Sequence, residues 1–332
     1  IYGHLKKLEG DLQVNWLHGA VGKNLEAEIP HWDFNKTLQE TKQKWNEELS
    51  KIEIKTFTED HKTTFYTALY HTNLTPILYE DVDGNYRGLD QNIYNSKGFT
   101  NYTIFSLWDT YRALHPLLNI TQPQRNNDMI KSMLAHHDQS VHGMLPIWSH
   151  YANENWCMIG YHAIPVIADA YAKGIRDYDA DLALEAMVHS AMQDDLGLSW
   201  YKKNGFIAAS DEPESVSKNL EYAYDDWCIA LLADSLGKEK IATNFYQRGQ
   251  YYKNLFDPST GFFRAKKSHT WFAPFKPEEV NFNYTEANAW QYSLFVPQDI
   301  EGHIELMGGA KNYEQHLDNM FNASTETSGR EQ

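Results

Sequence analysis

Apolar residues recur along most of the chain at helical spacing. Leu38, Trp45, Leu49 and Ile52 are separated by seven, four and three residues, which predicts an amphipathic helix of about four turns. Asn35 stands directly before this run and is its expected N-cap.

The same periodicity predicts further helices separated by loops. The second passes through Phe65, Leu69 and Thr72 and ends before Pro76, and the acidic segment 80–86 that follows is expected to be a turn or a short hairpin. The remaining predicted helices cover approximately residues 103–118, 125–139, 156–173, 180–192, 220–236, 239–255, 286–295 and 311–321. Strand patterns are confined to short pieces at 205–207 and 261–263.

Helices in consecutive pairs, with long aromatic loops between them, indicate an all-α fold with few short strands. We expect an (α/α)6 toroid of helical hairpins, which is incomplete in this chain because about one pair of helices is missing. No Pro-, Gly- or Ser-rich linker divides the sequence, so residues 23–332 are expected to form most of one domain, truncated at the C-terminus. Residues 1–22 fit no element and are interpreted as an interdomain segment.

Charge and composition exclude some classes of partner. The formal net charge is −16 and no Lys/Arg cluster is present, so nucleic-acid binding is not expected. No run of uncharged apolar residues is long enough to predict a membrane span. Cys157 and Cys228 are far apart in helical patterns, and we expect two buried free thiols rather than a disulfide or a metal pair.

The chain begins at Ile1 without a signal peptide, so its natural start is expected to have been removed or to lie upstream. Two of its sequons fall inside segments that carry candidate chemistry. A source that does not glycosylate them, most simply a bacterium, is therefore expected. The sequons are at Asn35, Asn73, Asn101, Asn119, Asn283 and Asn322.

Four aromatic segments contain carboxylates, and cleavage of a glycosidic bond needs two carboxyl groups. These segments are 105–112, 145–162, 220–227 and 284–292. Asp109 in the first segment could alternatively form an ion pair with Arg112, three residues on. Glu286 in the last could alternatively be an ordinary first-turn Glu of a helix capped by Thr285.

The sequence offers no convincing metal cluster. His136, His137 and His142 are neighbours but lack the spacing of a zinc site. Asp81 and the residues after it alternate like the start of an EF-hand loop, but Gly84 comes too early and the closing Glu is absent.

Together the four segments resemble glycoside hydrolase family 92, a family of exo-acting α-mannosidases. The resemblance runs from about residue 24 to the C-terminus, and its markers are the segments 65–71, 105–110, 157–162 and 285–292. It implies an N-terminal β-sandwich followed by an (α/α)6 catalytic domain, and inverting, calcium-assisted removal of terminal α-mannose. The β-sandwich of the family is not apparent in this chain.

The resemblance also assigns roles. Glu286 matches the general acid, and Asp109 matches a carboxylate that holds mannose in the −1 subsite. Trp108, Trp148 and Glu154 fall in segments that line this subsite and are expected to bind substrate. Ala287 replaces a more usual Gly, which a helical backbone tolerates.

The family's calcium ligands and general base match no segment here, so both are expected C-terminal to this chain. The implied substrates are mannose-containing oligosaccharides such as mannans or N-glycans. The implied location is the periplasm, exterior or surface of a bacterium. Two alternatives stay open: a different (α/α)6 glycosidase, trehalase-like or glucoamylase-like, and a catalytically incomplete mannan-binding module.

Overall fold

The computed structural model describes residues 31 and 33–329, and the expected interdomain segment 1–22 lies outside them. About half of the structure is helical. The longer helices are α4 (Phe34–Leu49), α5 (Glu59–His71), α7 (Leu114–Thr121), α8 (Pro123–Gln139), α9 (Ala163–Ala172), α10 (Ala180–Ala191), α12 (Ser215–Ser235), α13 (Glu239–Arg248) and α16 (Ala310–Phe321). The shorter ones are α6 (Leu107–Thr110), α11 (Leu198–Asn204), α14 (Ala289–Tyr292), α15 (Ile300–Leu306) and the 3₁₀ helix η1 (Tyr251–Leu255).

The strands are short and form two-stranded pairs. Five pairs are antiparallel: β1 (Ile77–Leu78) with β4 (Tyr102–Thr103), β2 (Asn85–Arg87) with β3 (Ile93–Asn95), β5 (Phe105–Ser106) with β6 (Trp148–Ser149), β7 (Phe256–Asp257) with β8 (Phe262–Phe263), and β9 (Lys266–Lys267) with β10 (Thr270–Trp271). The pair β11 (Glu279–Val280) and β12 (Ser328–Gly329) is parallel.

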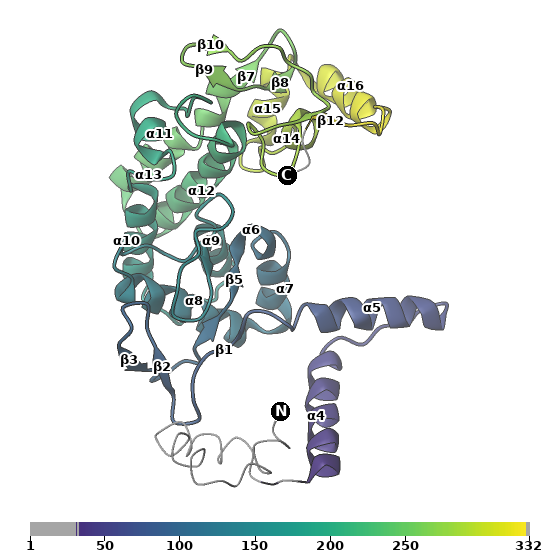
Figure 1. The fold of residues 1–332 in the computed structure, drawn as a ribbon, viewed down its shortest axis with the longest axis vertical. Coiled ribbons are helices and arrows are strands. Elements are labelled where there is room, and N and C mark those ends of the chain that lie inside the picture. Colours follow the sequence, from purple (N-terminus) through teal and green to yellow (C-terminus); the bar gives the residue numbers. More distant parts are fainter. Residues whose placement is uncertain (1–30, 32, 330–332) are drawn as a thin grey trace, which may run out of the picture.

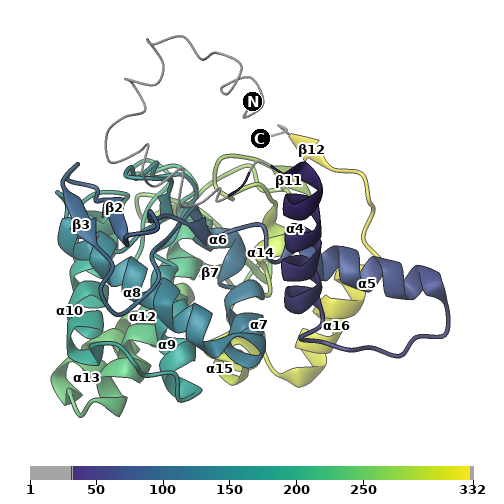
Figure 2. The same cartoon turned by 90° about the horizontal axis from the view of Figure 1, so that it is seen from below.

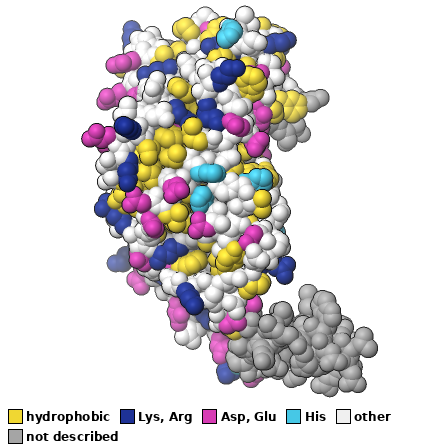
Figure 3. All heavy atoms as spheres, turned by 90° about the vertical axis from the view of Figure 1, so that its left-hand side faces the viewer, with side chains coloured by type: hydrophobic (Ala, Val, Ile, Leu, Met, Phe, Trp, Pro, Cys, Tyr) yellow, Lys and Arg dark blue, Asp and Glu magenta, His cyan; other side chains and the backbone are white. Residues whose placement is uncertain are grey.

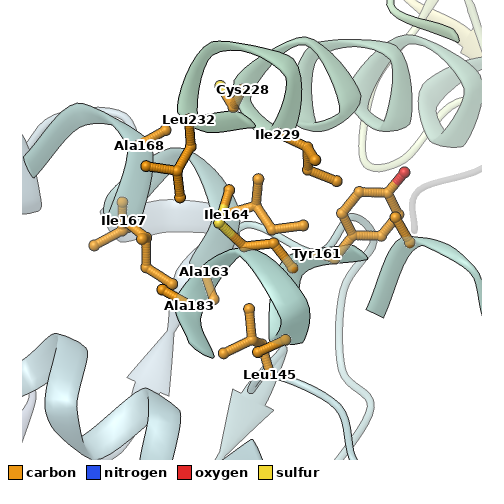
Figure 4. Packing of buried hydrophobic residues seen from close by; sticks show 14 of the residues in the cluster. Leu145, Tyr161, Ala163, Ile164, Ile167, Ala168, Ala183, Cys228, Ile229 and Leu232 are labelled. Carbon is orange, nitrogen blue, oxygen red and sulfur yellow. The ribbon is translucent and has the colours of Figure 1, made fainter. Parts of the chain in front are cut away.

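The core is centred on α9, whose residues are apolar except for Asp169 and the hydroxyl of Tyr171. Such a helix is stable only when neighbouring helices surround it, and α9 packs against α7, α8, α10 and α12. Ile164 and Ile167 of α9 meet Ile229 and Leu232 of α12 in this cluster (Figure 4). All four side chains are buried.

Helix α12 also forms the wall of a second apolar cluster. Its N-terminal residues Val216 and Leu220 pack with Phe263 and Tyr292 from the C-terminal part of the chain. One helix therefore joins the α8–α10 region to the region that contains α14, α15 and α16 (Figure 1).

The helices within the described residues form an open array rather than a closed ring (Figure 1). Helices α12 and α13 pack as a hairpin, as do α7 with α8 and α15 with α16. Helix α5 extends away from this body, and α4 packs against α5 (Figures 1 and 2). None of the described helices is both long and apolar enough to cross a membrane. Acidic and basic side chains are interspersed over the face shown in Figure 3.

Several expected helix boundaries are wrong because side chains cap or interrupt the helices elsewhere. Asp33, not Asn35, caps α4, since its Oδ1 accepts from Lys36 N at 3.1 Å. The expected helix 103–118 is divided into β4, β5, α6 and α7, and Ile104 between the two strands has a left-handed φ of 63°. The expected helix 156–173 begins only at Ala163.

The expected strand 205–207 does not form, because the side chain of Asn219 takes the hydrogen-bonding groups of Ile207. Its Oδ1 accepts from Ile207 N at 3.2 Å and its Nδ2 donates to Ile207 O at 3.3 Å. The helices α11 and α15 were not predicted. Of the two cysteines, both are free thiols, but Cys157 is exposed rather than buried.

Two of the sequon asparagines are buried. Asn101 and Asn119 donate through Nδ2 to Tyr79 O and to Asp169 Oδ2, both at 2.9 Å. Neither can carry a glycan in this fold, because the side chain is enclosed and already hydrogen-bonded.

Candidate active site

Trp108 and Asp109 lie in α6, directly after β5. The pairing of β5 with β6 places Ser106 opposite Trp148, so that Trp148 lies beside the start of α6. Ser106 Oγ donates to Asp109 Oδ2 at 2.5 Å. Asp109 itself is exposed, so its carboxylate is oriented by Ser106 while it stays accessible to a ligand.

Arg112 does not pair with Asp109, which rules out that alternative for Asp109. Its Nη2 lies 3.4 Å from Glu221 Oε1, and its Nε donates to Trp108 O at 3.0 Å. The guanidinium also lies over the Trp108 ring, 5.0 Å from the centroid. Arg112 therefore holds Trp108, and no salt bridge to Asp109 forms among residues 33–329.

Glu154 is enclosed, with a side chain only 7% exposed. Its Oε1 accepts from the backbone N–H groups of Trp148 at 2.8 Å and Trp156 at 3.1 Å, and its Oε2 accepts from Ile147 N at 3.1 Å. Burial raises the pKa of Glu154 in spite of these donors. The sequence places Glu154 among the substrate-binding residues, and this arrangement favours a role that acts through the shape of the loop around Trp148.

Glu286 is not in a helix, contrary to the expected boundaries. Helix α14 begins three residues later at Ala289, where Asn288 is the N-cap and forms a capping box with Gln291. Thr285 is therefore not the cap, and Glu286 is not a first-turn residue. The reading of Glu286 as an ordinary helix-capping carboxylate does not fit the structure.

The side chain of Glu286 is exposed, while both neighbours in the chain are buried. Thr285 N donates to Ser217 Oγ of α12 at 2.8 Å, and Tyr284 OH donates to Phe263 O at 2.7 Å. The backbone directly before Glu286 is thus anchored to the core, while the side chain of Glu286 is exposed.

Left-handed backbone conformations occur in the segments that carry the candidate residues. Besides Ile104, positive φ angles are found at Trp156 (55°), Met158 (65°) and Glu286 (48°). Such conformations are costly for residues with a side chain, and in proteins they gather at functional sites. The same strain also explains why the predicted helices 156–173 and 286–295 start late.

The segments of Trp108 and Glu286 converge on one carboxylate of α12. Glu221 is fully buried, and its Oε1 accepts from Trp108 Nε1 at 3.2 Å and from Tyr292 OH at 3.0 Å. Tyr292 lies on α14, six residues after Glu286. Trp108, Asp109, Trp148 and Glu286 are therefore gathered around the N-terminal half of α12.

The other oxygen of Glu221 contacts a buried histidine. His162 Nε2 lies 2.7 Å from Glu221 Oε2, and His162 Nδ1 lies 2.8 Å from Asp225 Oδ1. Burial alone would lower the pKa of His162, but attraction by Asp225 and Glu221 raises it to about 9. A protonated His162 donates from both ring nitrogens, and Tyr111 stacks on it with ring centroids 4.3 Å apart.

Within residues 31 and 33–329, no group of three or more His, Cys, Asp or Glu is arranged so that it could hold a metal ion. A calcium ion takes about six to eight oxygen ligands, and carbonyl groups and water can supply those that carboxylates do not.

Sequence reasoning assigned no role to Glu221, His162 or Asp225, although two of its four segments contain them. A usable signal was present, because Ser217, Glu221 and Asp225 recur every four residues and therefore share one face of a helix. Polar residues on the buried face of a helix need partners from other segments, and the sequence alone could not name those partners.

With this geometry established, comparison with known proteins decides the family. The model of the glycosyl hydrolase family 92 catalytic domain matches residues 21–332. The chain belongs to glycoside hydrolase family 92. The resemblance inferred from the four aromatic segments is confirmed.

Solved family 92 enzymes share the fold. The chain is similar to a family 92 α-mannosidase from Bacteroides thetaiotaomicron, with 44% identity, a TM-score of 0.87 and coverage of 91% of this chain and 41% of that one. It is also similar to an inverting family 92 mannosidase from the same species, with 33% identity, a TM-score of 0.84 and coverage of 90% and 42%. These likenesses confirm the expected helical toroid, of which this chain holds an open part.

A curated relative comes from the fungus Arthroderma benhamiae and is described as an uncharacterized secreted glycosidase. It is 27% identical over 347 residues, which cover 91% of this chain and 40% of that protein. The chain therefore spans about two fifths of the length of these relatives.

Proposed function

We propose that the protein to which this chain belongs is an exo-α-mannosidase that releases terminal α-linked mannose from oligosaccharides such as mannans or N-glycans. The observation that carries the proposal is the convergence of the Trp108–Asp109 segment and the Glu286 segment on Glu221. This convergence supports a site in which the exposed carboxylate of Glu286 transfers a proton and the exposed carboxylate of Asp109 acts beside aromatic rings suited to a sugar.

In this proposal Glu286 is the general acid. It protonates the glycosidic oxygen as the bond to the anomeric carbon breaks, so that the departing sugar leaves as a neutral alcohol. Asp109, oriented by Ser106, accepts hydrogen bonds from mannose hydroxyls. Trp108 and Trp148 line the subsite, and Glu154 keeps the backbone at Trp148 in place.

We further propose that hydrolysis proceeds with inversion, which the description of one solved relative as an inverting mannosidase supports. An inverting enzyme needs a second carboxylate about 6.5–9.5 Å from the acid, with a water molecule between the base and the sugar. The base is expected in the part of the protein that lies C-terminal to this chain. The same holds for the ligands of a calcium ion, which the family resemblance implies.

The proposed location is the periplasm or the outside of a bacterial cell. The relative described as secreted and the two solved relatives from Bacteroides thetaiotaomicron support this assignment.

The test uses the full-length protein on matched aryl α-mannosides and aryl α-glucosides. We expect hydrolysis of the mannosides, with the β-anomer of mannose as the first product, followed by NMR before mutarotation. A preference for the glucosides would indicate that the protein is another glycosidase of the same fold and not a mannosidase. Binding of mannan without hydrolysis of any glycoside would favour the catalytically incomplete binding module.

A further inference from the structure

Helix α12 carries a polar stripe inside the core. Ser217, Glu221 and Asp225 follow each other at intervals of four residues and therefore lie on one face of the helix. All three have 0% relative exposure. Burial of two carboxylates is costly unless each is fully paired, so their partners determine what the stripe does.

Each member of the stripe holds a different segment of the candidate site. Ser217 Oγ accepts from Thr285 N at 2.8 Å, directly before Glu286. Asp225 Oδ2 accepts from Tyr161 N at 3.0 Å, at the turn that leads into α9. Glu221 lies between these two contacts and joins two segments at once.

A single oxygen atom of Glu221 connects the segment of α6 to the segment of α14. Its Oε1 accepts from Trp108 Nε1 at 3.2 Å and from Tyr292 OH at 3.0 Å, while its Oε2 is held by His162 at 2.7 Å. Because one oxygen accepts from Trp108, Tyr292 and also Arg112 Nη2, the position of α6 relative to α14 depends on where this carboxylate lies. His162, clamped in turn by Asp225, restricts the rotation of the carboxylate.

We propose that Glu221 is a positioning residue that sets the placement of Trp108 and Asp109 relative to Glu286. This inference rests on the proposed mannosidase function. Glu221 is not itself a catalytic residue, because it is fully enclosed and its oxygens are occupied by protein donors. A displacement of about 1 Å between reacting groups can cost about 100-fold in rate, so such a role would be visible in catalysis.

The same helix offers a matched control in Asp226. It is equally buried, but its partners are Arg248 Nε at 2.8 Å and Tyr161 OH at 2.9 Å, and it contacts neither α6 nor α14. Loss of its charge tests what removal of a buried α12 carboxylate does to the fold without disturbing the contacts of Glu221.

The experiment compares Glu221→Gln with Asp226→Asn in the full-length protein, at a temperature well below both melting transitions. We expect Glu221→Gln to lower kcat on an aryl α-mannoside by about 10- to 100-fold with a smaller change in KM. Asp226→Asn should lower the melting temperature and leave kcat unchanged. Equal losses of kcat in the two variants would overturn the proposal.

Two milder variants decide the question if either carboxylate variant fails to fold. Tyr292→Phe removes one hydroxyl donor from Glu221, and Tyr161→Phe removes one from Asp226. Both are Tyr-to-Phe changes at buried positions. A lower kcat in Tyr292→Phe alone supports the proposal, and equal kcat values in the two variants contradict it.

Hydrogen–deuterium exchange separates this inference from the proposed function. In Glu221→Gln we expect faster amide exchange in the peptides covering 105–112 and 285–293, and in Asp226→Asn we expect wild-type exchange in both. If the wild-type protein is inactive on mannosides but this exchange pattern appears, the positioning role of Glu221 is supported and the proposed mannosidase function is contradicted. Wild-type exchange in both peptides of Glu221→Gln overturns the positioning role, whatever the activity.

Discussion

The carboxylates around α12 have contrasting surroundings at the scale of single residues. The side chains of Glu154 and Glu221 are enclosed, whereas Asp109 and Glu286 are exposed. An enclosed carboxylate organises the chain around it, and an exposed one can meet a substrate. This contrast agrees with the proposal that Asp109 and Glu286 act on the substrate and that the other two carboxylates support the site.

Glu286→Gln in the full-length protein should remove the acid while keeping side-chain size. General acid catalysis contributes about 10²–10⁴-fold, or roughly 3–5 kcal/mol of barrier. An aryl mannoside with a very acidic phenol needs little protonation, so the variant should retain far more activity on it than on a mannose disaccharide. Steady-state rates on the two substrates measure this difference. Equal slowing of both would remove Glu286 as the acid.

His162 predicts a dependence of stability on pH. Its pKa in the folded protein is about 9, above its ordinary value of 6.5, so folding strengthens proton binding. The corresponding stability is complete below pH 6.5 and is lost as pH rises toward 9, and it amounts to roughly 3 kcal/mol by the linkage relation. The melting temperature should therefore fall over this range.

His162→Gln is the control for this fall, because its melting temperature should change little between pH 6.5 and 9. Burial lowers the pKa of His115 to about 4 and that of His136 to about 3, so they affect stability only below this window. A variant with the same fall as wild type would show that another group is responsible.

At the scale of elements, a short loop and a long helix do most of the positioning. Glu154 accepts hydrogen bonds from three backbone N–H groups of the loop 147–156, and Trp148 in this loop pairs with Ser106 of β5. The buried carboxylates on one face of helix α12 accept hydrogen bonds from the segments of α6 and α14 and from the turn before α9. The short elements that carry the candidate residues owe their placement to these contacts rather than to their own helical propensity.

Glu154→Ala should release this loop. Three backbone N–H groups would lose their acceptor, and each one left unpaired away from water costs about 1–3 kcal/mol if the loop cannot rearrange. We expect a lower melting temperature together with a higher KM for mannosides, because Trp148 would no longer be held. Glu305→Ala, at an exposed position on α15, is a matched control that should change neither quantity. An unchanged KM in a destabilised Glu154→Ala would limit Glu154 to a structural role.

At the scale of the whole molecule, the described residues form an open array that covers about two fifths of the solved relatives. The residues proposed as acid and as sugar-binding carboxylate, Glu286 and Asp109, both lie among the described residues. No group of three or more His, Cys, Asp or Glu that could hold a metal ion is found in this part of the chain.

Calcium dependence is a prediction about the whole protein. In the full-length protein we expect excess chelator to abolish hydrolysis of α-mannosides and added calcium to restore it, because the family resemblance implies calcium. Magnesium added at the same concentration serves as the control and should restore little, since its smaller size demands a stricter ligand geometry. Full activity in excess chelator would contradict the predicted dependence on calcium.

The sequence by itself determined the helical class, the approximate positions of most long helices, the family and the segments that carry Asp109 and Glu286. These features follow from local periodicity and from short motifs, which need no knowledge of distant contacts. The family match over residues 21–332 confirms what those motifs indicated.

Only the tertiary structure decided where the helices of the site begin and which buried groups support it. Propensity could not foresee that Asn288 would cap α14 and leave Glu286 outside it, or that Arg112 would turn from Asp109 to Glu221. The partners of Glu221 are up to 113 residues away in the chain. Pairing over such distances depends on how the helices pack, because a buried carboxylate must take whichever donors the fold brings to it.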